Sequence, residues 1–122
     1  MTEIKIDDLK TLCMTALTKT GLSNEHAAIT VDHYLENECS GKKSHGMVRV
    51  LQIPPAIQKY GLPVKEIEIT KDNNNIAAID GHMSTGPVVG KAVLEETILR
   101  SKKHGLALVG ANRYLGNSGS MA

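Results

Sequence analysis

The spacing of the apolar residues changes once along the chain, near residue 63, and this change limits the possible folds more than any other feature. Before it, apolar residues recur at intervals of three and four, which is the pattern of amphipathic helices. After it, residues 66–70 alternate between polar and apolar, which is the period of a half-buried strand. The sequence therefore predicts a helical segment over residues 1–63 and the start of an α/β domain over residues 64–122.

Three helices are predicted in the helical segment. The first starts at residue 7 or 8 and stops at Gly21. Its buried stripe consists of Leu9, Leu12, Cys13, Ala16 and Leu17. Ser23 can cap a second helix, which ends near Glu38. A third helix is expected after a polar turn, and two prolines at residues 54–55 must bend, restart or end it.

A hairpin is predicted at the start of the α/β domain. Residues 66–70 and 76–80 have the pattern of two strands, and the three asparagines between them supply turn residues. Residues 81–87 are expected to form a loop that leads into the next helix. The second strand would therefore end at residue 80.

A crossover unit follows the hairpin. Pro87 is well placed as the first residue of a long helix that continues to about residue 103. Its buried side is expected to consist of Val89, Ala92, Val93 and Leu94. Residues 106–109 predict a short strand buried on both faces, and residues 110–119 predict a loop. Strand, long helix and strand connect parallel strands, so the fold class is α/β with part of a mixed sheet.

Composition argues against nucleic acid and membranes as partners. The chain has 14 Lys and Arg against 13 Asp and Glu, a formal charge of +1, so no strong field attracts a polyanion. It lacks Phe and Trp, and it has neither a long apolar run nor a signal-peptide pattern. Cys13 and Cys39 are too far apart for a disulfide framework, which favours a reducing, cytoplasmic location.

Two weaker patterns are interpreted as structural. His26 and His33 share a helix face close to Glu36, but they lack the spacing of helical zinc sites, so we expect solvent-facing histidines and no metal. Gly81 and Gly86 have the spacing of a P-loop, yet proline and valine stand where lysine and a hydroxyl residue would hold phosphate. No Rossmann glycine fingerprint is present, so a dinucleotide would have to bind in another way.

Ser44, His45 and Arg49 form the candidate site. If the segment after Gly46 is helical, Arg49 lies about one turn from His45 on the same face, while Ser44 can cap the helix start. A fixed cation beside a group that titrates near neutrality suits an anionic substrate that undergoes proton transfer. Each residue also has an ordinary interpretation, because capping serines, solvated histidines and surface arginines are common at helix starts.

Four motifs follow one another along the chain: Ser44-His45-Gly46 with Arg49, Ile79-Asp80-Gly81, Gly86-Pro87-Val88-Val89-Gly90, and Val109 leading to Leu115-Gly116. Together they resemble the N-terminal part of the type-2 malate/L-lactate dehydrogenases. That family includes ureidoglycolate, sulfolactate and 2,3-diketogulonate oxidoreductases and imine-reducing relatives. The resemblance covers nearly the whole chain. It implies a non-Rossmann α/β fold, NAD or NADP as cofactor, and a homodimer or higher homo-oligomer.

The resemblance also implies roles for individual residues. Carried over by position, His45 would exchange a proton at the substrate oxygen, Ser44 would hydrogen-bond to His45, and Arg49 would bind the substrate carboxylate. Tyr114 stands where many relatives have a histidine. It can still donate a hydrogen bond, but its reference pKa near 10 makes it a poorer base, so the second catalytic position stays open.

The cofactor site is expected to lie mostly beyond the end of this chain, with Gly116 and Gly119 as candidate contacts. Family members are much longer, so we expect the chain to be the N-terminal portion of such a protein. The first hypothesis is therefore an oxidoreductase, or its N-terminal part, that transfers hydride between NAD(P) and a small 2-hydroxy or 2-oxo acid. The alternative is a non-catalytic, truncated or diverged module that dimerises or binds a carboxylate ligand without cofactor.

Overall fold

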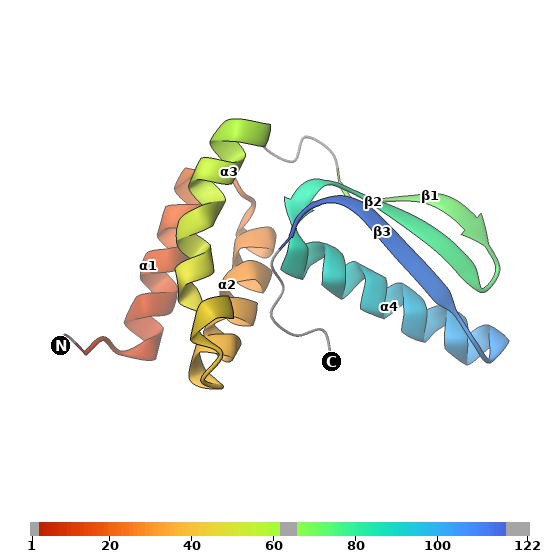
Figure 1. Ribbon diagram of the computed structural model, residues 1–122, viewed down its shortest axis with the longest axis horizontal. Helices are drawn as coiled ribbons and strands as arrows, with labels where there is room; N and C mark the ends of the chain where they lie inside the picture. Colours follow the sequence, from red (N-terminus) through yellow and green to blue (C-terminus); the bar gives the residue numbers. More distant parts are fainter. Residues whose placement is uncertain (1–2, 62–65, 117–122) are drawn as a thin grey trace. The chain divides into compact units, whose positions relative to one another are not determined.

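The computed structural model describes residues 3–61 and 66–116, which belong to two compact units (Figure 1). Residues 3–61 form the helical unit, and residues 66–116 form the sheet unit. The domain boundary predicted near residue 63 lies outside the described residues.

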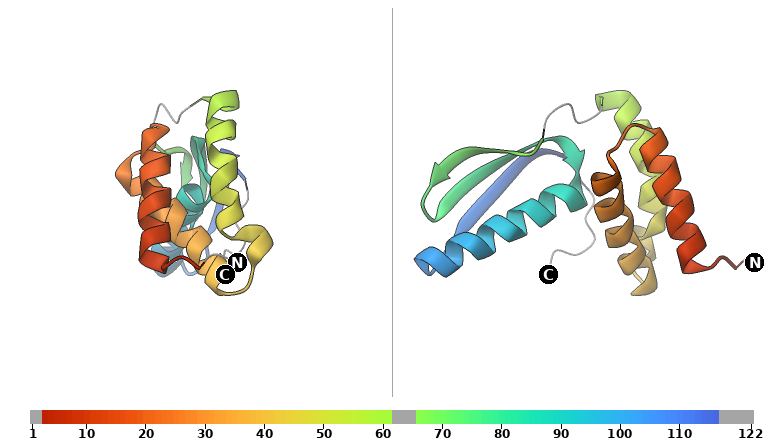
Figure 2. Two further views of the ribbon diagram at one scale, coloured as in Figure 1. Left: turned by 90° about the vertical axis from the view of Figure 1, so that its left-hand side faces the viewer. Right: turned by 180° about the vertical axis from the view of Figure 1, so that it is seen from behind.

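The helical unit contains three α-helices and two short 3₁₀ helices (Figure 2). In chain order they are α1 (Ile6–Lys19), α2 (Asn24–Cys39), η1 (Lys43–His45), η2 (Met47–Gln52) and α3 (Ile53–Tyr60). The Ser23 hydroxyl accepts a hydrogen bond from the His26 amide at 3.1 Å, so the predicted cap of α2 is confirmed. The two prolines lie in the first turn of α3, where their missing N–H groups cost no helical hydrogen bond, and the expected break is also confirmed.

The core of the helical unit is aliphatic apart from one tyrosine. Its buried members are Leu17, Leu22, Ala27, Val31, Tyr34, Val50 and Ile53. The stripe predicted for α1 was partly wrong, because Leu12 and Ala16 are exposed while Leu17 is fully buried. A periodic stripe shows which residues share a face, but the position of the neighbouring helix decides which of them it covers.

The sheet unit follows the expected order of strand, strand, helix and strand. Its elements are β1 (Glu68–Asn73), β2 (Ile76–Thr85), α4 (Gly86–His104) and β3 (Leu108–Leu115). β1 pairs antiparallel with β2, and β3 pairs parallel with β2, so the mixed sheet and the crossover helix are confirmed. Figures 1 and 2 show α4 running along one face of the three strands.

The ends of β2 and β3 differ from the prediction. β2 continues to Thr85, so the predicted loop over residues 81–87 was wrong, and β3 covers most of the loop predicted over residues 110–119. The two extensions pair with each other, Thr85 opposite Leu115. Local turn residues suggested loops because the sequence does not show that each strand end has a partner 30 residues away.

Three predictions of burial were also wrong. Leu94 of α4 is 52% exposed, and Leu106 and Leu108 are 74% and 68% exposed, so the last strand is not buried on both faces. β1 is exposed along its length rather than half-buried. Within residues 66–116, α4 is the helix that covers a face of the sheet.

None of the helices that the structure describes is both long enough and apolar enough to cross a membrane.

Candidate functional site

The structure brings Ser44, His45 and Arg49 together in one tight turn. The Ser44 hydroxyl lies 3.0 Å from His45 Nδ1, so the contact expected between these neighbours is present. Arg49 Nε donates to the Ser44 carbonyl oxygen at 2.8 Å, and Nη1 donates to Gln52 Oε1 at 3.0 Å. These bonds hold the guanidinium beside the turn.

The local backbone differs from the expected α-helix start. η1 has no side-chain cap, so the predicted capping role of Ser44 was wrong, and its hydroxyl contacts the imidazole instead. Arg49 lies in the 3₁₀ helix η2, whose tighter turn brings the Arg49 amide to the Gly46 carbonyl at 3.0 Å. His45 and Arg49 belong to separate 3₁₀ helices, so the predicted common helix face is wrong, and the two residues are linked through Ser44.

Two residues at the end of α2 form hydrogen bonds with the backbone of the turn, and the sequence analysis predicted neither contact. Asn37 is only 5% exposed, and its Nδ2 donates to the His45 carbonyl oxygen at 3.0 Å. Glu38 Oε2 accepts a hydrogen bond from the Met47 amide at 2.9 Å. Gly46 lies directly against Glu38. These contacts fix the backbone on both sides of the imidazole.

Replacing Gly46 with alanine is expected to disturb this turn. An added Cβ would overlap the Glu38 carboxylate, which must then leave its bond to the Met47 amide, and it would also press on Glu38 Cα at 3.1 Å. Overpacking of this kind costs about 1–3 kcal/mol. Urea unfolding should show that loss, and NMR should show shifted His45 ring signals. Gly110→Ala is the control, because a Cβ at Gly110 meets nothing within 4 Å. Equal stability of the two variants would contradict the close packing.

The turn can act on an anionic ligand. His45 is half-buried, and no hydrogen bond of its Nε2 is found among the described residues. The Arg49 guanidinium has five N–H donors, of which the two bonds above use two, so its Nη2 edge can still bind an oxyanion. A titratable nitrogen and a permanent cation are thus held by one rigid segment.

The other predicted site residues belong to the sheet unit. Tyr114 lies on β3, opposite Ser84 of β2, and is 43% exposed. Gly116 follows the end of β3, and a Cβ there would meet nothing within 4 Å. Gly119 lies outside the described residues.

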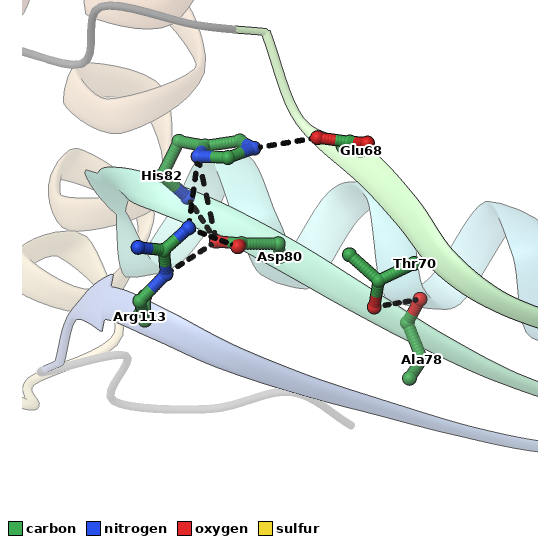
Figure 3. Close-up of polar contacts among 6 residues, drawn as sticks. All are labelled: Glu68, Thr70, Ala78, Asp80, His82 and Arg113. Carbon is green, nitrogen blue, oxygen red and sulfur yellow. Dashed lines mark hydrogen bonds and ion pairs between the residues drawn. The ribbon is translucent and has the colours of Figure 1, made fainter.

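A second polar cluster, formed by Glu68, Asp80, His82 and Arg113, was not predicted (Figure 3). Arg113 Nε donates to Asp80 Oδ1 at 3.0 Å, and its Nη2 bonds to Asp80 Oδ2. His82 Nε2 lies 3.0 Å from Glu68 Oε2, and its Nδ1 lies 3.1 Å from Arg113 Nη2. We name these four side chains the clamp. The sequence singled out Asp80 only as part of the Ile79-Asp80-Gly81 motif, and no local pattern reveals its pairing with Arg113, which lies 33 residues away.

The clamp changes the acidity of Asp80. The hydrogen bond from Arg113 is the main cause that lowers the pKa of Asp80 to about 2, and the His82 amide, which donates to Asp80 Oδ1 at 2.9 Å, lowers it further. Asp80 is therefore ionised at any physiological pH.

Because this pKa is depressed, stability should fall in acid. An unfolded aspartate has a pKa of 3.8, so between about pH 4 and about pH 2 the unfolded chain binds the proton that the folded chain still rejects. The Asp80 contribution is complete above the unfolded pKa and is lost as the pH falls through the folded one. The urea midpoint of the sheet unit should fall less steeply over this range in Asp80→Asn than in the parent chain. Parallel curves would contradict the ion pair.

The two histidines of α2 were predicted to face the solvent, but both His26 and His33 are half-buried. His33 Nε2 lies 3.2 Å from Asn37 Nδ2, and burial lowers the pKa of His33. Among residues 3–61 and 66–116, no group of three or more His, Cys, Asp or Glu side chains is arranged to hold a metal ion.

Comparisons with known proteins agree on one family. A family model described as malate/L-lactate dehydrogenase matches residues 4–120. L-sulfolactate dehydrogenase from Methanocaldococcus jannaschii is 34% identical over 107 residues, which cover 87% of this chain and 31% of that protein. Malate/(S)-sulfolactate dehydrogenase from Methanothermus fervidus is 31% identical over 108 residues, covering 88% and 32%. The solved structure of malate dehydrogenase from Pyrococcus horikoshii OT3 matches with a TM-score of 0.87 at 26% identity, covering 96% of this chain and 34% of that one. The chain spans about a third of the length of these curated relatives.

Proposed function

The chain belongs to the malate/L-lactate dehydrogenase family, as its motifs indicated, and from this premise we propose that it forms the substrate-binding part of an oxidoreductase of small 2-hydroxy acids. The observation that carries the proposal is the turn in which His45 and Arg49 are held together. Malate and sulfolactate, which the relatives' names give, are 2-hydroxy acids with a second acidic group. The turn offers a guanidinium for a carboxylate and an imidazole for the neighbouring hydroxyl group, so it suits ligands of this kind.

Arg49 binds the substrate carboxylate in this proposal. Its Nε is already held by the Ser44 carbonyl, so the remaining N–H groups are oriented before the ligand arrives. A guanidinium offers two parallel hydrogen bonds to a carboxylate and keeps its charge throughout the reaction. Orientation in advance reduces the conformational entropy that ligand binding would otherwise cost.

His45 moves the proton at the substrate oxygen. The Ser44 hydroxyl can either donate to His45 Nδ1 or accept from it, so it supports both tautomers of the neutral ring. Nε2 can therefore take a proton from the alcohol during oxidation and return it during reduction. Asn37 and Glu38 keep the backbone of the turn fixed while the ring changes its protonation state.

NAD or NADP would supply or accept the hydride at the carbon that bears the oxygen. The chain offers a suitable edge, because ligands of α/β sheets bind outside the carboxyl ends of parallel strands, where β2 and β3 end. Gly116 leaves open space there, and the buried Ser84 hydroxyl has no hydrogen-bond partner among the described residues. We propose Gly116 and Tyr114 as contacts of a ligand at this edge.

The wider setting is also part of the proposal. The thiols of Cys13 and Cys39 are both free, which fits a reducing cytoplasm. A homodimer or higher homo-oligomer would bring further residues to the site. The small carboxylate substrate is the partner that the turn itself recognises.

Titration of the chain with NADH and with NADPH, followed by nicotinamide fluorescence, tests the cofactor. A saturable change is expected for at least one of them. The competing hypothesis is a module that binds carboxylates without cofactor. Saturable carboxylate binding with no response to either nucleotide would favour that module, and it would contradict the proposal that this chain itself contacts the nucleotide.

A further inference from the structure

Three non-glycine residues adopt left-handed backbone conformations close to the carboxyl ends of β2 and β3. Their φ angles are +45° for His82, +63° for Met83 and +49° for Arg113. The register between the two strands shifts between Asp80 and Ser84, so His82 and Met83 lie in a bulge opposite Arg113. Such conformations are unfavourable for residues with a Cβ and persist only where the surroundings enforce them.

The side chains of the clamp connect the two segments that have these left-handed conformations. Asp80 accepts two hydrogen bonds from the Arg113 guanidinium and one from the His82 amide, so a single carboxylate joins both strained segments (Figure 3). His82 is held between Glu68 on one side and Arg113 on the other. Both ring nitrogens of His82 and both carboxylate oxygens of Asp80 are thereby engaged. The bonding groups of Asp80 and His82 are therefore used within the sheet unit, which gives these two residues a structural task.

The position of the clamp suggests what that task is. Arg113 immediately precedes Tyr114 in β3, so the left-handed conformation of Arg113 sets the direction in which the Tyr114 side chain projects from the strand. Tyr114 lies opposite Ser84, whose buried hydroxyl has no hydrogen-bond partner among the described residues. Both lie at the edge where parallel strands receive ligands. Backbone strain beside an unpaired buried hydroxyl is typical of a functional edge.

We propose that Asp80 is a positioning residue that acts through Arg113 to orient Tyr114 toward the ligand at the carboxyl ends of β2 and β3. The inference rests on the proposed function for the nature of the ligand. The orientation of Tyr114 is independent of it.

Two variants release the clamp in different ways. Asp80→Asn removes the charge with little change in shape, and Arg113→Gly removes the side chain while relieving the left-handed strain. Asn74→Gly is the matched control, because Asn74 also has a left-handed φ of +51° but lies in the turn between β1 and β2. Arg113→Lys retains a cation for Asp80 and serves as the conservative variant.

The first measurement is NMR of the full 122-residue chain with labelled tyrosine. Asp80→Asn and Arg113→Gly should move the Tyr114 ring signals toward random-coil values, while the methyl signals of Ile79 and Val89 keep their positions. Asn74→Gly should leave Tyr114 unchanged, and Arg113→Lys should lie between Arg113→Gly and the parent chain. Unchanged Tyr114 signals in both clamp variants would overturn the proposal.

The second measurement is the dissociation constant of whichever nucleotide the parent chain binds. It should rise at least threefold in Asp80→Asn and in Arg113→Gly, and it should be unchanged in Asn74→Gly. Parent-like affinity in both clamp variants would overturn the link to ligand binding. If the parent chain binds neither NADH nor NADPH, this chain does not itself form a nucleotide site, and the Tyr114 signals still decide whether the clamp positions the ring.

Discussion

Arg49→Ala is expected to weaken the binding of malate to the chain tenfold or more. The substitution removes a charge-assisted, two-point contact with the carboxylate, which is worth on the order of 1.5–3 kcal/mol. Since each 1.4 kcal/mol corresponds to about a factor of ten in the dissociation constant, the loss is readily measured. Calorimetric or NMR titration with malate checks it.

The controls for Arg49→Ala separate geometry from net charge. Arg49→Lys keeps the cation but loses the planar fork and the bond from Nε to the Ser44 carbonyl, so its affinity should fall between those of the parent and the alanine variant. Lys19→Ala removes the same charge from the last turn of α1 and should not change the affinity. An Arg49→Ala variant that binds malate as tightly as Lys19→Ala does would remove Arg49 from the site.

Gly81→Ala is expected to be the most damaging single-methyl change in the sheet unit. An added Cβ would lie 2.8 Å from the Arg113 carbonyl oxygen, 2.8 Å from Val89 Cγ2 and 3.2 Å from the Asn112 carbonyl oxygen. Two of these atoms are backbone of the neighbouring strand, which cannot turn away as a flexible side chain could. The expected loss of stability is about 1–3 kcal/mol, the range for overpacking in a well-packed interior.

Gly110→Ala is the matched control for Gly81→Ala. Gly110 lies on β3 of the same sheet, but a Cβ there meets nothing within 4 Å. The substitution should therefore be neutral or slightly stabilising. Urea unfolding followed through the NMR signals of Ile79 compares the two. If Gly81→Ala lowers the midpoint no more than Gly110→Ala does, the strands do not approach as closely as described.

The helices and the order of the elements could be predicted because their signals are local. The cap at Ser23 lies three residues from the amide that it accepts, and the hairpin between β1 and β2 closes over a short asparagine turn. A helix between two apolar strands likewise indicated a crossover, because few other arrangements satisfy that order.

The strand ends could not be predicted because their signals are distant. Residues 81–85 contain glycine, serine and threonine, which favour a loop on local grounds. They belong to β2 because Ser84 pairs with Tyr114 and Thr85 pairs with Leu115. The bulge also places His82 and Met83 in left-handed backbone conformations, which are unfavourable for residues with a Cβ. Tertiary pairing here overrides local preference.

For the candidate site as well, contacts between residues close in sequence could be predicted and distant ones could not. Ser44, His45 and Arg49 lie within six residues of one another, so their grouping followed from spacing alone. Asn37 and Glu38 contact the turn from eight and nine residues away, and their types are ordinary for a helix end. Asp80 and Arg113 are farther apart still. Residues that hold a site are harder to predict than residues that form it.

The central claim is that the His45–Arg49 turn recognises a 2-hydroxy acid, and a paired titration with malate and succinate tests it most directly. The two ligands share both carboxylates, and only malate has the hydroxyl at which His45 would exchange a proton. Malate should shift the NMR signals of Arg49 Nε and of the His45 ring with one saturable constant. Succinate should shift Arg49 Nε while leaving the His45 ring unchanged or nearly so. Identical responses of His45 to both ligands, or no saturable response to malate, would contradict the claim.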